Sequence, residues 1–288
     1  MKTVIIDTKN PKISISNETL VVDNRKIPFN LIENILIFST CTLNTKDINK
    51  ITLNGKNIIL VDYKLNSTLI TSTKAKNSQL KISQYKAFVN KRLQIAKNIL
   101  SLKIISHINH LKNLEIFLNQ EEILQKIENA NNIETLLGVE GSFSKLYFDN
   151  FFLKAPKLWH KNKRSKRPPK DALNALLSFG YTLYYNHIAI FLVTAGFEPS
   201  IGFLHTPFRG HFALSSDILE AFRADINAFM LEQIKREVVT LKDFTKKDGV
   251  YLRYEGRKKL YKNWQEFVEN SRLNLTKTLY DLKESFND

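Results

Sequence analysis

The spacing of apolar residues changes near residue 78, and this change constrains the fold more than any other feature of the sequence. Before it, short apolar runs such as Ile35-Leu36-Ile37 and Ile58-Ile59-Leu60 are separated by Asn, Gly, Pro and Lys, as in strands joined by tight turns. After it, apolar residues recur every three or four positions, as on one face of a helix. The sequence therefore predicts an α+β protein with a small N-terminal β domain followed by a larger all-α C-terminal domain.

The domain boundaries follow from the same patterns. We place the β domain at residues 1–72, the linker at residues 73–77 and the helical domain at residues 78–288. The short segment 67–77 as a whole is a plausible linker between the domains.

Helices are expected in both domains. A short one at residues 45–53 should be capped by Asn44 or Thr45. A long amphipathic helix should begin at Ser78 and continue past residue 100. Further helices are expected near residues 119–129, 132–150, 171–195, 216–239 and 259–283.

The charge balance points to a polyanionic partner. The chain carries 43 Lys and Arg against 28 Asp and Glu, a formal net charge of +15. Such an excess suits DNA, RNA or an anionic membrane surface, with solubility alone as the alternative. The single cysteine, Cys41, excludes an intramolecular disulfide and a Cys-based zinc site.

One stretch is long enough to cross a membrane. No charged side chain lies between Asp171 and Glu198. Asn, Ser, Thr and His side chains interrupt this stretch, so we interpret it as a buried helix of a globular core. The first residues are too short an apolar run for a signal peptide. We therefore expect a cytoplasmic protein that makes no membrane contact.

The densest positive charge lies in residues 157–170, here called the basic strap. Seven of its fourteen residues are Lys or Arg, and Pro168-Pro169 prevents a helix there. Because charge of this density repels itself, we expect the basic strap to bind phosphates. A solvated loop without a ligand is the alternative. The side chains expected to contact nucleic acid are Lys161, Lys163, Arg164, Lys166, Arg167 and Lys170.

The C-terminal half holds a histidine and several acids that could form a site. His205 lies between glycine and proline and is expected on a loop. Asp217 and Glu220 would share one face of a helix. With Ser215 or Ser216 as the N-cap, both acids would fall in the first turn, where the helix dipole alone favours them.

Glu140 is the most suggestive of these acids. It interrupts an apolar helical stretch, where an acid needs a partner such as a metal ion or an arginine. An imidazole with two or three carboxylates is a suitable ligand set for Mg²⁺ or Mn²⁺. On a basic chain, these residues suggest metal-assisted chemistry on nucleic acid.

Several sequence blocks, taken in order, resemble the CRISPR-associated Cas1 family, the integrase subunit of spacer acquisition. The blocks are Gln84-Tyr85, Ala96-Lys97 with Lys103, Leu137-Gly138-Val139-Glu140-Gly141, Arg167-Pro168-Pro169-Lys170-Asp171, Ala195-Gly196-Phe197-Glu198-Pro199, Gly202-Phe203-Leu204-His205 and Asp217-Ile218-Leu219-Glu220.

This resemblance implies a set of site residues. It assigns Glu140, His205 and Glu220 as the catalytic ligands of Mg²⁺ or Mn²⁺. Asp217 matches a second acid found in some members, which makes it a possible auxiliary acid. Family members often have aspartate where this chain has Glu220. The resemblance also adds Arg209 and Arg223 to the side chains of the basic strap as DNA-binding residues.

The same resemblance implies an activity and its partners. A 3′-hydroxyl of protospacer DNA would attack a phosphodiester of the CRISPR repeat, a transesterification without a covalent enzyme intermediate, in adaptive defence against phage and plasmids. Homodimers formed through the β domain would flank a dimer of Cas2 in a heterohexamer. Two alternatives remain, a stand-alone metal-dependent nuclease acting on branched DNA in repair and a catalytically silent DNA-binding scaffold.

Overall fold

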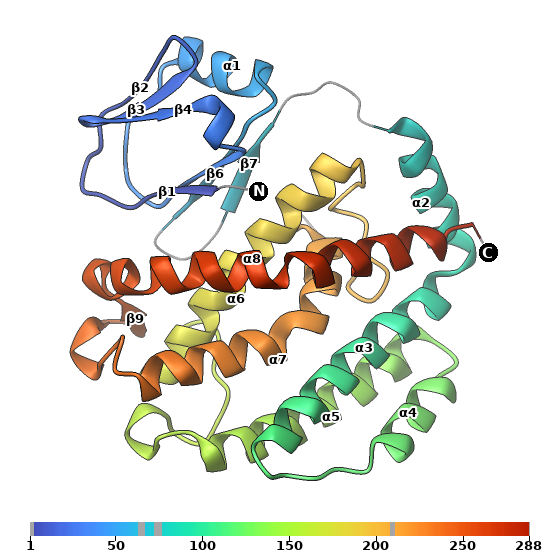
Figure 1. The fold of residues 1–288 in the computed structure, drawn as a ribbon. Helices are drawn as coiled ribbons and strands as arrows, with labels where there is room; N and C mark the ends of the chain where they lie inside the picture. Colours follow the sequence, from blue (N-terminus) through green and yellow to red (C-terminus); the bar gives the residue numbers. More distant parts are fainter. Residues whose placement is uncertain (1–2, 63–66, 72–76, 208–210, 288) are drawn as a thin grey trace. The chain divides into compact units, whose positions relative to one another are not determined.

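The computed structural model describes residues 3–62, 67–71, 77–207 and 211–287. The chain forms two compact units, Met1–Lys76 and Asn77–Asp288. The first is built mainly of strands and the second mainly of helices (Figure 1). The predicted order of a small β part and a larger helical part is confirmed.

The N-terminal unit contains two sheets. In the first, β1 and β5 are parallel, β5 and β6 are parallel, and β6 and β7 are antiparallel. In the second, β2, β3 and β4 form an antiparallel meander. The elements are β1 (Thr3–Ile6), β2 (Ile13–Ser16), β3 (Thr19–Val22), β4 (Arg25–Pro28), the 3₁₀ turn η1 (Phe29–Leu31), β5 (Asn34–Ile37), α1 (Thr45–Leu53), β6 (Asn57–Val61) and β7 (Ser67–Ile70).

Alternation of apolar and polar residues decides which strand faces enter the core. In β2 the isoleucines are buried and the two serines are exposed. Ile35 on β5 and Ile58 on β6 lie opposite each other and are fully buried, and Ile51 from α1 joins their cluster. The helix predicted at residues 45–53 is confirmed, with the Asn44 side chain accepting a hydrogen bond from the Lys46 amide at 2.8 Å.

The predicted connection was partly wrong. Residues 67–70 form β7, which pairs with β6, because Leu69 and Ile70 supply enough apolar surface for an edge strand. Most of the predicted linker lies outside the described residues, and Asn77 is the N-cap of α2, where its side chain accepts a hydrogen bond from the Leu80 amide.

The C-terminal unit is a helical bundle with one hairpin. The predicted long helix from Ser78 is interrupted at Lys91, whose backbone leaves the helical region. The prediction of an all-α domain was incomplete, because β8 and β9 pair as a short antiparallel ribbon. The elements are α2 (Ser78–Asn90), α3 (Arg92–Asn113), α4 (Gln120–Glu128), α5 (Ile133–Lys154), the 3₁₀ turn η2 (Lys157–Trp159), α6 (Ala172–Ala195), α7 (Ala213–Lys235), the 3₁₀ turn η3 (Leu241–Asp243), β8 (Phe244–Lys246), β9 (Val250–Leu252) and α8 (Tyr254–Glu284).

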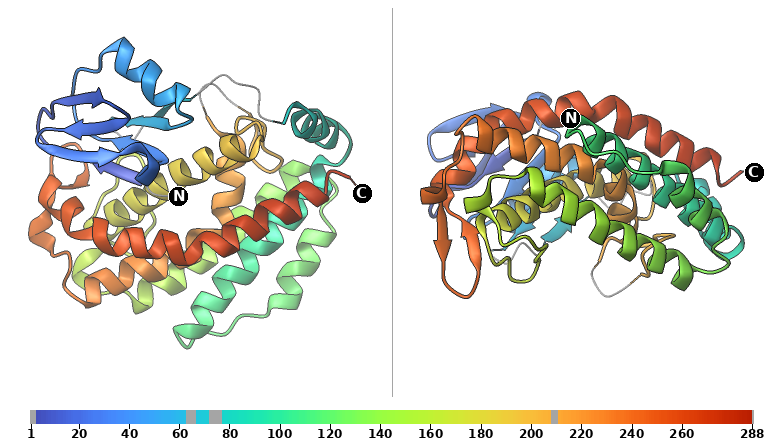
Figure 2. Two further views of the ribbon diagram at one scale, coloured as in Figure 1. Left: turned by 45° about the horizontal axis from the view of Figure 1, so that its top comes forward. Right: turned by 90° about the horizontal axis from the view of Figure 1, so that it is seen from below.

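Helix α7 is central to this bundle. It packs against α3 and α6, and α3 also packs against α5. Gly180 of α6 permits close approach, since a Cβ there would lie 2.5 Å from the Met230 side chain of α7. The aromatic residues Trp264 and Phe267 of α8 pack against Phe229 of α7, and Figure 2 shows α8 beside these helices.

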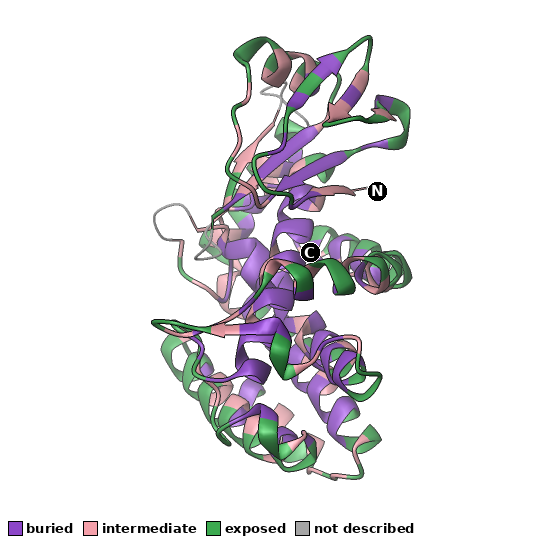
Figure 3. Cartoon of the chain, turned by 90° about the vertical axis from the view of Figure 1, so that its left-hand side faces the viewer, coloured by how far each residue is buried: buried purple, intermediate pink, exposed green. Residues whose placement is uncertain are grey.

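Helix α6 is the charge-free stretch noted in the sequence. Among the described helices it alone is long and apolar enough to cross a membrane, but most of its apolar window is buried within the unit. Buried residues gather in the interior of the helical unit in Figure 3. Asp171 caps the start of α6, and Gly196, at φ 94°, ends it. Its burial supports the interpretation as a core helix.

Candidate active site

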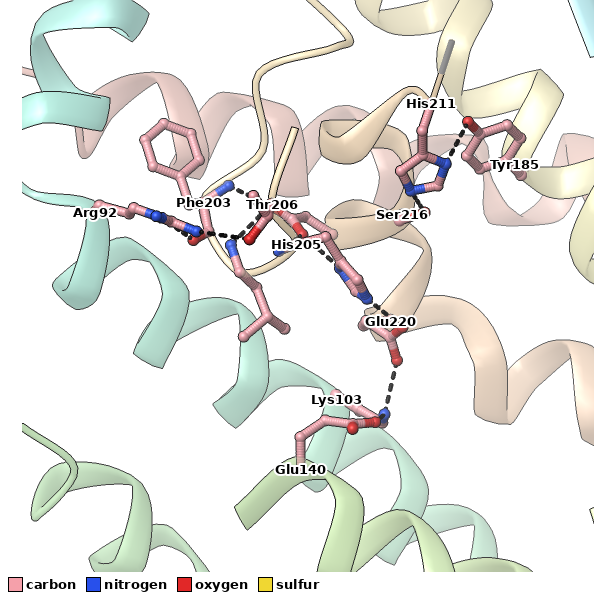
Figure 4. Close-up of polar contacts among 12 residues, drawn as sticks. Arg92, Lys103, Glu140, Tyr185, Phe203, His205, Thr206, His211, Ser216 and Glu220 are labelled. Atoms are coloured by element: carbon pink, nitrogen blue, oxygen red, sulfur yellow. Dashed lines mark hydrogen bonds and ion pairs between the residues drawn. The ribbon is translucent and has the colours of Figure 1, made fainter. Parts of the chain in front are cut away.

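Four helix-borne or loop-borne side chains converge in the C-terminal unit (Figure 4). Glu140 comes from α5, Lys103 from α3, Glu220 from α7, and His205 from the connection between α6 and α7. The Lys103 ammonium forms ion pairs with Glu140 Oε1 and, at 2.8 Å, with Glu220 Oε2. His205 Nε2 lies 3.9 Å from Glu220 Oε1. The structure therefore brings the predicted Glu140, His205 and Glu220 together.

Lys103 was not assigned to the site from the sequence. The expected partner of Glu140 was a metal ion or an arginine, and the structure instead provides this lysine, whose side chain is only 3% exposed. Ser144, one turn further along α5, donates a hydrogen bond to Glu140 Oε1 at 2.7 Å. A signal was present, because Leu100, Ile104 and Lys103 all fall on the buried face of α3.

The two glutamates are held in their charged forms. Burial raises the pKa of Glu220, but the charges of Arg223, Lys103 and His205 outweigh it and hold this pKa far below its usual value. Burial likewise opposes ionisation of Glu140, yet Lys103 lowers its pKa. Both carboxylates are therefore available to bind a cation.

The Arg223 side chain contacts Glu220 and Tyr181 within the protein. Its Nε donates a hydrogen bond to Glu220 Oε1 at 2.9 Å, and its guanidinium lies 4.5 Å from the centre of the Tyr181 ring. Despite burial, the charge of Glu220 raises the pKa of Arg223. The guanidinium is thus engaged inside the protein, which argues against its predicted role as a phosphate ligand on the surface.

Asp217 organises the loop that carries His205. Its buried carboxylate accepts hydrogen bonds from the backbone amides of Phe203, Leu204 and His205, the last two at 3.0 and 2.9 Å. The same carboxylate lies 2.7 Å from His205 Nδ1. With Nδ1–H donating to Asp217, the lone pair of Nε2 is left toward Glu220, as is usual for a metal-binding imidazole.

The predicted first-turn position of the two acids was wrong. Helix α7 begins at Ala213, and the side chain of its N-cap residue, Phe212, makes no capping hydrogen bond. Ser215 therefore lies inside the helix, where it is fully buried. Asp217 is therefore in the second turn, where it has no exposed helix terminus to stabilise. Packing of α7 against the rest of the bundle turns these acids inward.

The pKa of His205 reflects opposing effects. Burial lowers this pKa, but the hydrogen bond and charge of Asp217, with a further contribution from Glu220, raise it above its usual value. The imidazole is half-buried, and its outer edge remains accessible. The lone pair of its Nε2 is therefore available only above a pH set by this raised pKa.

Other contacts anchor the same loop. The Arg92 Nε donates to the Phe203 carbonyl at 3.0 Å. The Gln84 side chain donates to the carbonyls of Glu198 and Ile201 and accepts from the Glu198 amide, each at 2.9 Å. Helices α2 and α3 thus fix the backbone that precedes His205.

A second histidine, not anticipated from the sequence, borders the site. His211 Nε2 lies 3.0 Å from the Ser216 hydroxyl, and its ring stacks on Tyr185 (Figure 4). Burial, together with the charge of His205, lowers the pKa of His211. It therefore presents a neutral imidazole near the start of α7.

The donor set fits a divalent cation in its chemistry. Two ionised carboxylates and a neutral imidazole nitrogen suit Mg²⁺ or Mn²⁺. The described residues contain no group of three His, Cys, Asp or Glu side chains already arranged to hold a metal ion. The Lys103 ammonium lies between Glu140 and Glu220, and the Arg223 guanidinium contacts the other oxygen of Glu220. The position shared by the two glutamates is thus filled by an ammonium.

The basic strap divides into exposed and inward-facing side chains. Arg164 turns inward, where it donates to Asn174 Oδ1 at 2.8 Å and lies over the rings of Phe148 and Tyr181. Arg164 therefore holds the strap in place. This differs from the prediction that its side chain contacts nucleic acid. Arg209 lies outside the described residues. The exposed charges are Lys161, Lys163, Lys166, Arg167 and Lys170.

Lys166 connects the basic strap with the carboxylates. Desolvation, with repulsion from Arg223 and Arg164, lowers its pKa, while Glu220 and Glu140 oppose the shift. These mutual effects place its ammonium within electrostatic reach of the centre. The charges of Lys166 and of the two carboxylates therefore influence each other.

Comparison with known proteins identifies the family. Residues 4–266 match the family model for CRISPR associated protein Cas1. The chain therefore belongs to the Cas1 family.

Relatives in this family are similar along most of the chain. A CRISPR-associated endonuclease Cas1 from Thermodesulfovibrio yellowstonii is 29% identical over 295 residues, covering 94% of this chain and 93% of that protein. A Cas1 endonuclease from Clostridium perfringens is 32% identical over 259 residues, covering 84% and 78%.

Solved structures show the same fold. A Cas1 protein from Thermotoga maritima superposes with a TM-score of 0.91 at 21% identity, covering 99% of this chain and 97% of that one. A casposase bound to its integration product has a TM-score of 0.84 at 22% identity, covering 93% and 83%. At these identities the likeness establishes the fold.

Proposed function

We propose that this chain is a metal-dependent DNA endonuclease and integrase of CRISPR spacer acquisition. It joins protospacer DNA to the CRISPR array by attack of a 3′-hydroxyl on a repeat phosphodiester, in defence against phage and plasmids. The observation that carries the proposal is the cluster of Glu140, Glu220 and His205, in which one ammonium contacts both carboxylates and His205 Nε2 lies 3.9 Å from Glu220 Oε1. Membership of the Cas1 family, whose relatives are named endonucleases, supports it.

The roles of the residues follow from their contacts. Glu140 and Glu220, both kept ionised, would supply oxygen ligands, and His205 would supply Nε2. Asp217 holds the imidazole in the tautomer that leaves Nε2 free to bind. A bound Mg²⁺ or Mn²⁺ would neutralise charge on the phosphate and lower the pKa of the attacking hydroxyl. No nucleophilic side chain is required.

DNA would be held through its backbone. The exposed cations of the basic strap, Lys161, Lys163, Arg167 and Lys170, can contact phosphates without reading sequence. Lys166 extends this charge toward the carboxylates. We therefore propose that the strap positions a phosphodiester at the centre.

The solved relatives suggest the partners. They include a Cas1–DNA complex and a Cas6-RT-Cas1–Cas2 complex. We propose double-stranded DNA, as protospacer and repeat, and Cas2 as partners of this chain. We further propose a cytoplasmic homodimer formed through the β domain, two of which flank a Cas2 dimer.

A strand-transfer assay tests the proposal. Purified protein, with and without its cognate Cas2, is mixed with a short duplex bearing free 3′-hydroxyls and a supercoiled repeat plasmid, in Mn²⁺ or in EDTA. Joined product should disappear with EDTA and in Glu140→Ala, His205→Ala and Glu220→Ala. The exposed Asp149, in a surface pair with Lys145, provides the control Asp149→Ala, which should remain active.

Two outcomes would favour other functions. Metal-dependent cutting of branched DNA that needs neither Cas2 nor a repeat would indicate a stand-alone nuclease. Tight DNA binding without joining or cutting in any metal, unchanged by the three substitutions, would indicate a silent scaffold.

A further inference from the structure

The structure assigns Lys103 a role beyond packing. We propose that its ammonium is an internal counter-cation that fills the metal position in the metal-free protein and competes with the divalent ion for Glu140 and Glu220. The affinity of the site for metal is then set by this lysine as well as by the ligands. This inference rests on the proposed metal site.

The contacts of Lys103 are those of a cation in a ligand cage. Nζ contacts Glu140 Oε1, Glu220 Oε2 at 2.8 Å and the Ser144 hydroxyl at 3.0 Å. These three oxygens come from α5 and α7, whereas the lysine comes from α3. The ammonium of Lys103 therefore connects helices α3, α5 and α7 through its polar contacts.

The burial of Lys103 and Glu220 means that their ion pair affects the stability of the site. The side chains of Lys103 and Glu220 are 3% and 4% exposed. A buried carboxylate without a compensating charge is strongly unfavourable. Glu220 is compensated by both Lys103 and Arg223, whereas Glu140, whose side chain is 26% exposed, is compensated by Lys103. In the metal-free chain this lysine is therefore the cation that the two glutamates share.

The local charge explains why the ammonium and the metal compete. Among the side chains joined by direct contacts, which leaves out Lys166, Asp217, Glu140 and Glu220 contribute three negative charges. Lys103 and Arg223 contribute two positive ones, so with a neutral imidazole the formal sum of this contact set is −1. A divalent ion added to this set brings the sum to +1. Like charges within a few ångströms repel strongly in a buried site, so the metal must displace the ammonium from the carboxylates.

The sum of +1 has a functional consequence. It is opposite to the single negative charge of a phosphodiester. After metal binding, Lys103 has left the carboxylates but stays in the centre together with Arg223. The centre then carries one net positive charge, which attracts the phosphodiester of DNA. In the absence of DNA, the same excess weakens metal binding.

Mn²⁺ binding without DNA tests the proposal. The first variant is Lys103→Met, which keeps the approximate length of the side chain and removes its charge. The second is Lys103→Gln, which also removes the charge but keeps N–H donors, and it is used if Lys103→Met does not fold. Lys145→Met removes an exposed, ion-paired lysine from α5 and is the matched control. Mn²⁺ affinity is measured by calorimetry, and thermal unfolding is followed in EDTA and in Mn²⁺.

Loss of the competing charge should tighten Mn²⁺ binding by at least about fivefold. The melting temperature of the Lys103 variants should fall in EDTA and should rise more on adding Mn²⁺ than that of the wild type. The control should match the wild type in both measurements. Unchanged or weaker Mn²⁺ affinity in the Lys103 variants would overturn the proposal, because a lysine that only supports packing would change stability without improving affinity.

The same measurements distinguish a failure of the proposed metal site from a failure of the proposed competition. If Glu140→Ala binds Mn²⁺ as well as the wild type does, the metal site itself is wrong. If Glu140→Ala abolishes binding while Lys103→Met leaves it unchanged, the metal site stands and only the competition is refuted.

Discussion

Replacing Asp217 by asparagine, an isosteric change, should strongly destabilise the helical unit. The carboxylate accepts four hydrogen bonds, from the amides of Phe203, Leu204 and His205 and from His205 Nδ1. One oxygen receives the first two and the other receives the last two. An asparagine amide replaces one of these oxygens with an NH₂ group. In one orientation the Phe203 and Leu204 amides lose their acceptor, and in the other the His205 amide loses it and the imidazole must change tautomer.

The magnitude follows from that count. Each buried donor left without a partner costs about 1–3 kcal/mol, so the loss is about 2–6 kcal/mol in the first orientation and about 1–3 kcal/mol in the second. The side chain of Asp217 is fully buried, so water cannot replace the lost acceptor. A domain of this kind is stable by only about 5–15 kcal/mol. Asp217→Asn should therefore remove a large part of the stability of the helical unit.

Metal binding should also suffer. If the new NH₂ group faces His205 Nδ1, the imidazole must accept there and carry its proton on Nε2, which removes the lone pair needed for a ligand. Loss of such an orienting partner typically lowers metal affinity by about 10–100-fold. The Mn²⁺ affinity of Asp217→Asn should fall by that factor.

Urea denaturation in EDTA and Mn²⁺ calorimetry measure the two effects. Asp149→Asn is the control, because this exposed aspartate pairs with Lys145 one turn away, a surface pair whose loss should change stability by less than about 1 kcal/mol. The reasoning is refuted if Asp217→Asn destabilises the protein no more than the control does. It is also refuted if Mn²⁺ affinity is unchanged in a variant that has lost stability.

Three further predictions concern the strap, pH and the loop. Arg164→Ala should lower the free energy of unfolding by about 2–4 kcal/mol through lost buried hydrogen bonds, whereas Lys163→Ala, at an exposed position, should stay within about 0.5 kcal/mol. Because the pKa of His205 is raised, Mn²⁺ affinity should fall as pH drops through it, beginning above the ordinary value of 6.5, and His205→Ala should lose this pH dependence. In the metal-free protein the same shift stabilises the fold below pH 6.5, and that contribution is lost as pH rises through the folded-state pKa. Gly202→Ala should destabilise by about 1–3 kcal/mol, since its Cβ would lie 2.7 Å from a backbone carbon, whereas Gly141→Ala, with open space around a helical glycine, should stabilise by up to about 1 kcal/mol. Equal effects of the two glycine substitutions, read by thermal unfolding, would contradict the close approach.

The charge of the basic strap serves two purposes. Arg164 lies inside, between two aromatic rings, and ties the strap to α6 through Asn174. Its exposed neighbours, such as Lys163 and Arg167, remain free of such contacts among the described residues and face solvent. A run of basic residues therefore cannot be assigned to DNA binding as a block.

The sequence by itself determined the local structure of this protein. Apolar spacing predicted the helices, apart from the break at Lys91, and strands such as β5 and β6, because each pattern depends on residues a few positions apart. It did not predict β7 or the β8–β9 ribbon. Asn44 predicted the start of α1, because a cap is a contact between near neighbours. The sequence also marked Glu140, as an acid on an apolar helix that needs a partner.

Only the tertiary structure decided what those residues contact. The ammonium that meets Glu140 belongs to Lys103, 37 positions earlier, and it also meets Glu220 from a third helix. Asp217 looked like an acid at a helix terminus and proved to be a buried acceptor for a loop. The physical reason is that buried charges are stabilised by groups that packing brings together, and the spacing of residues along one helix carries no record of what lies on the next.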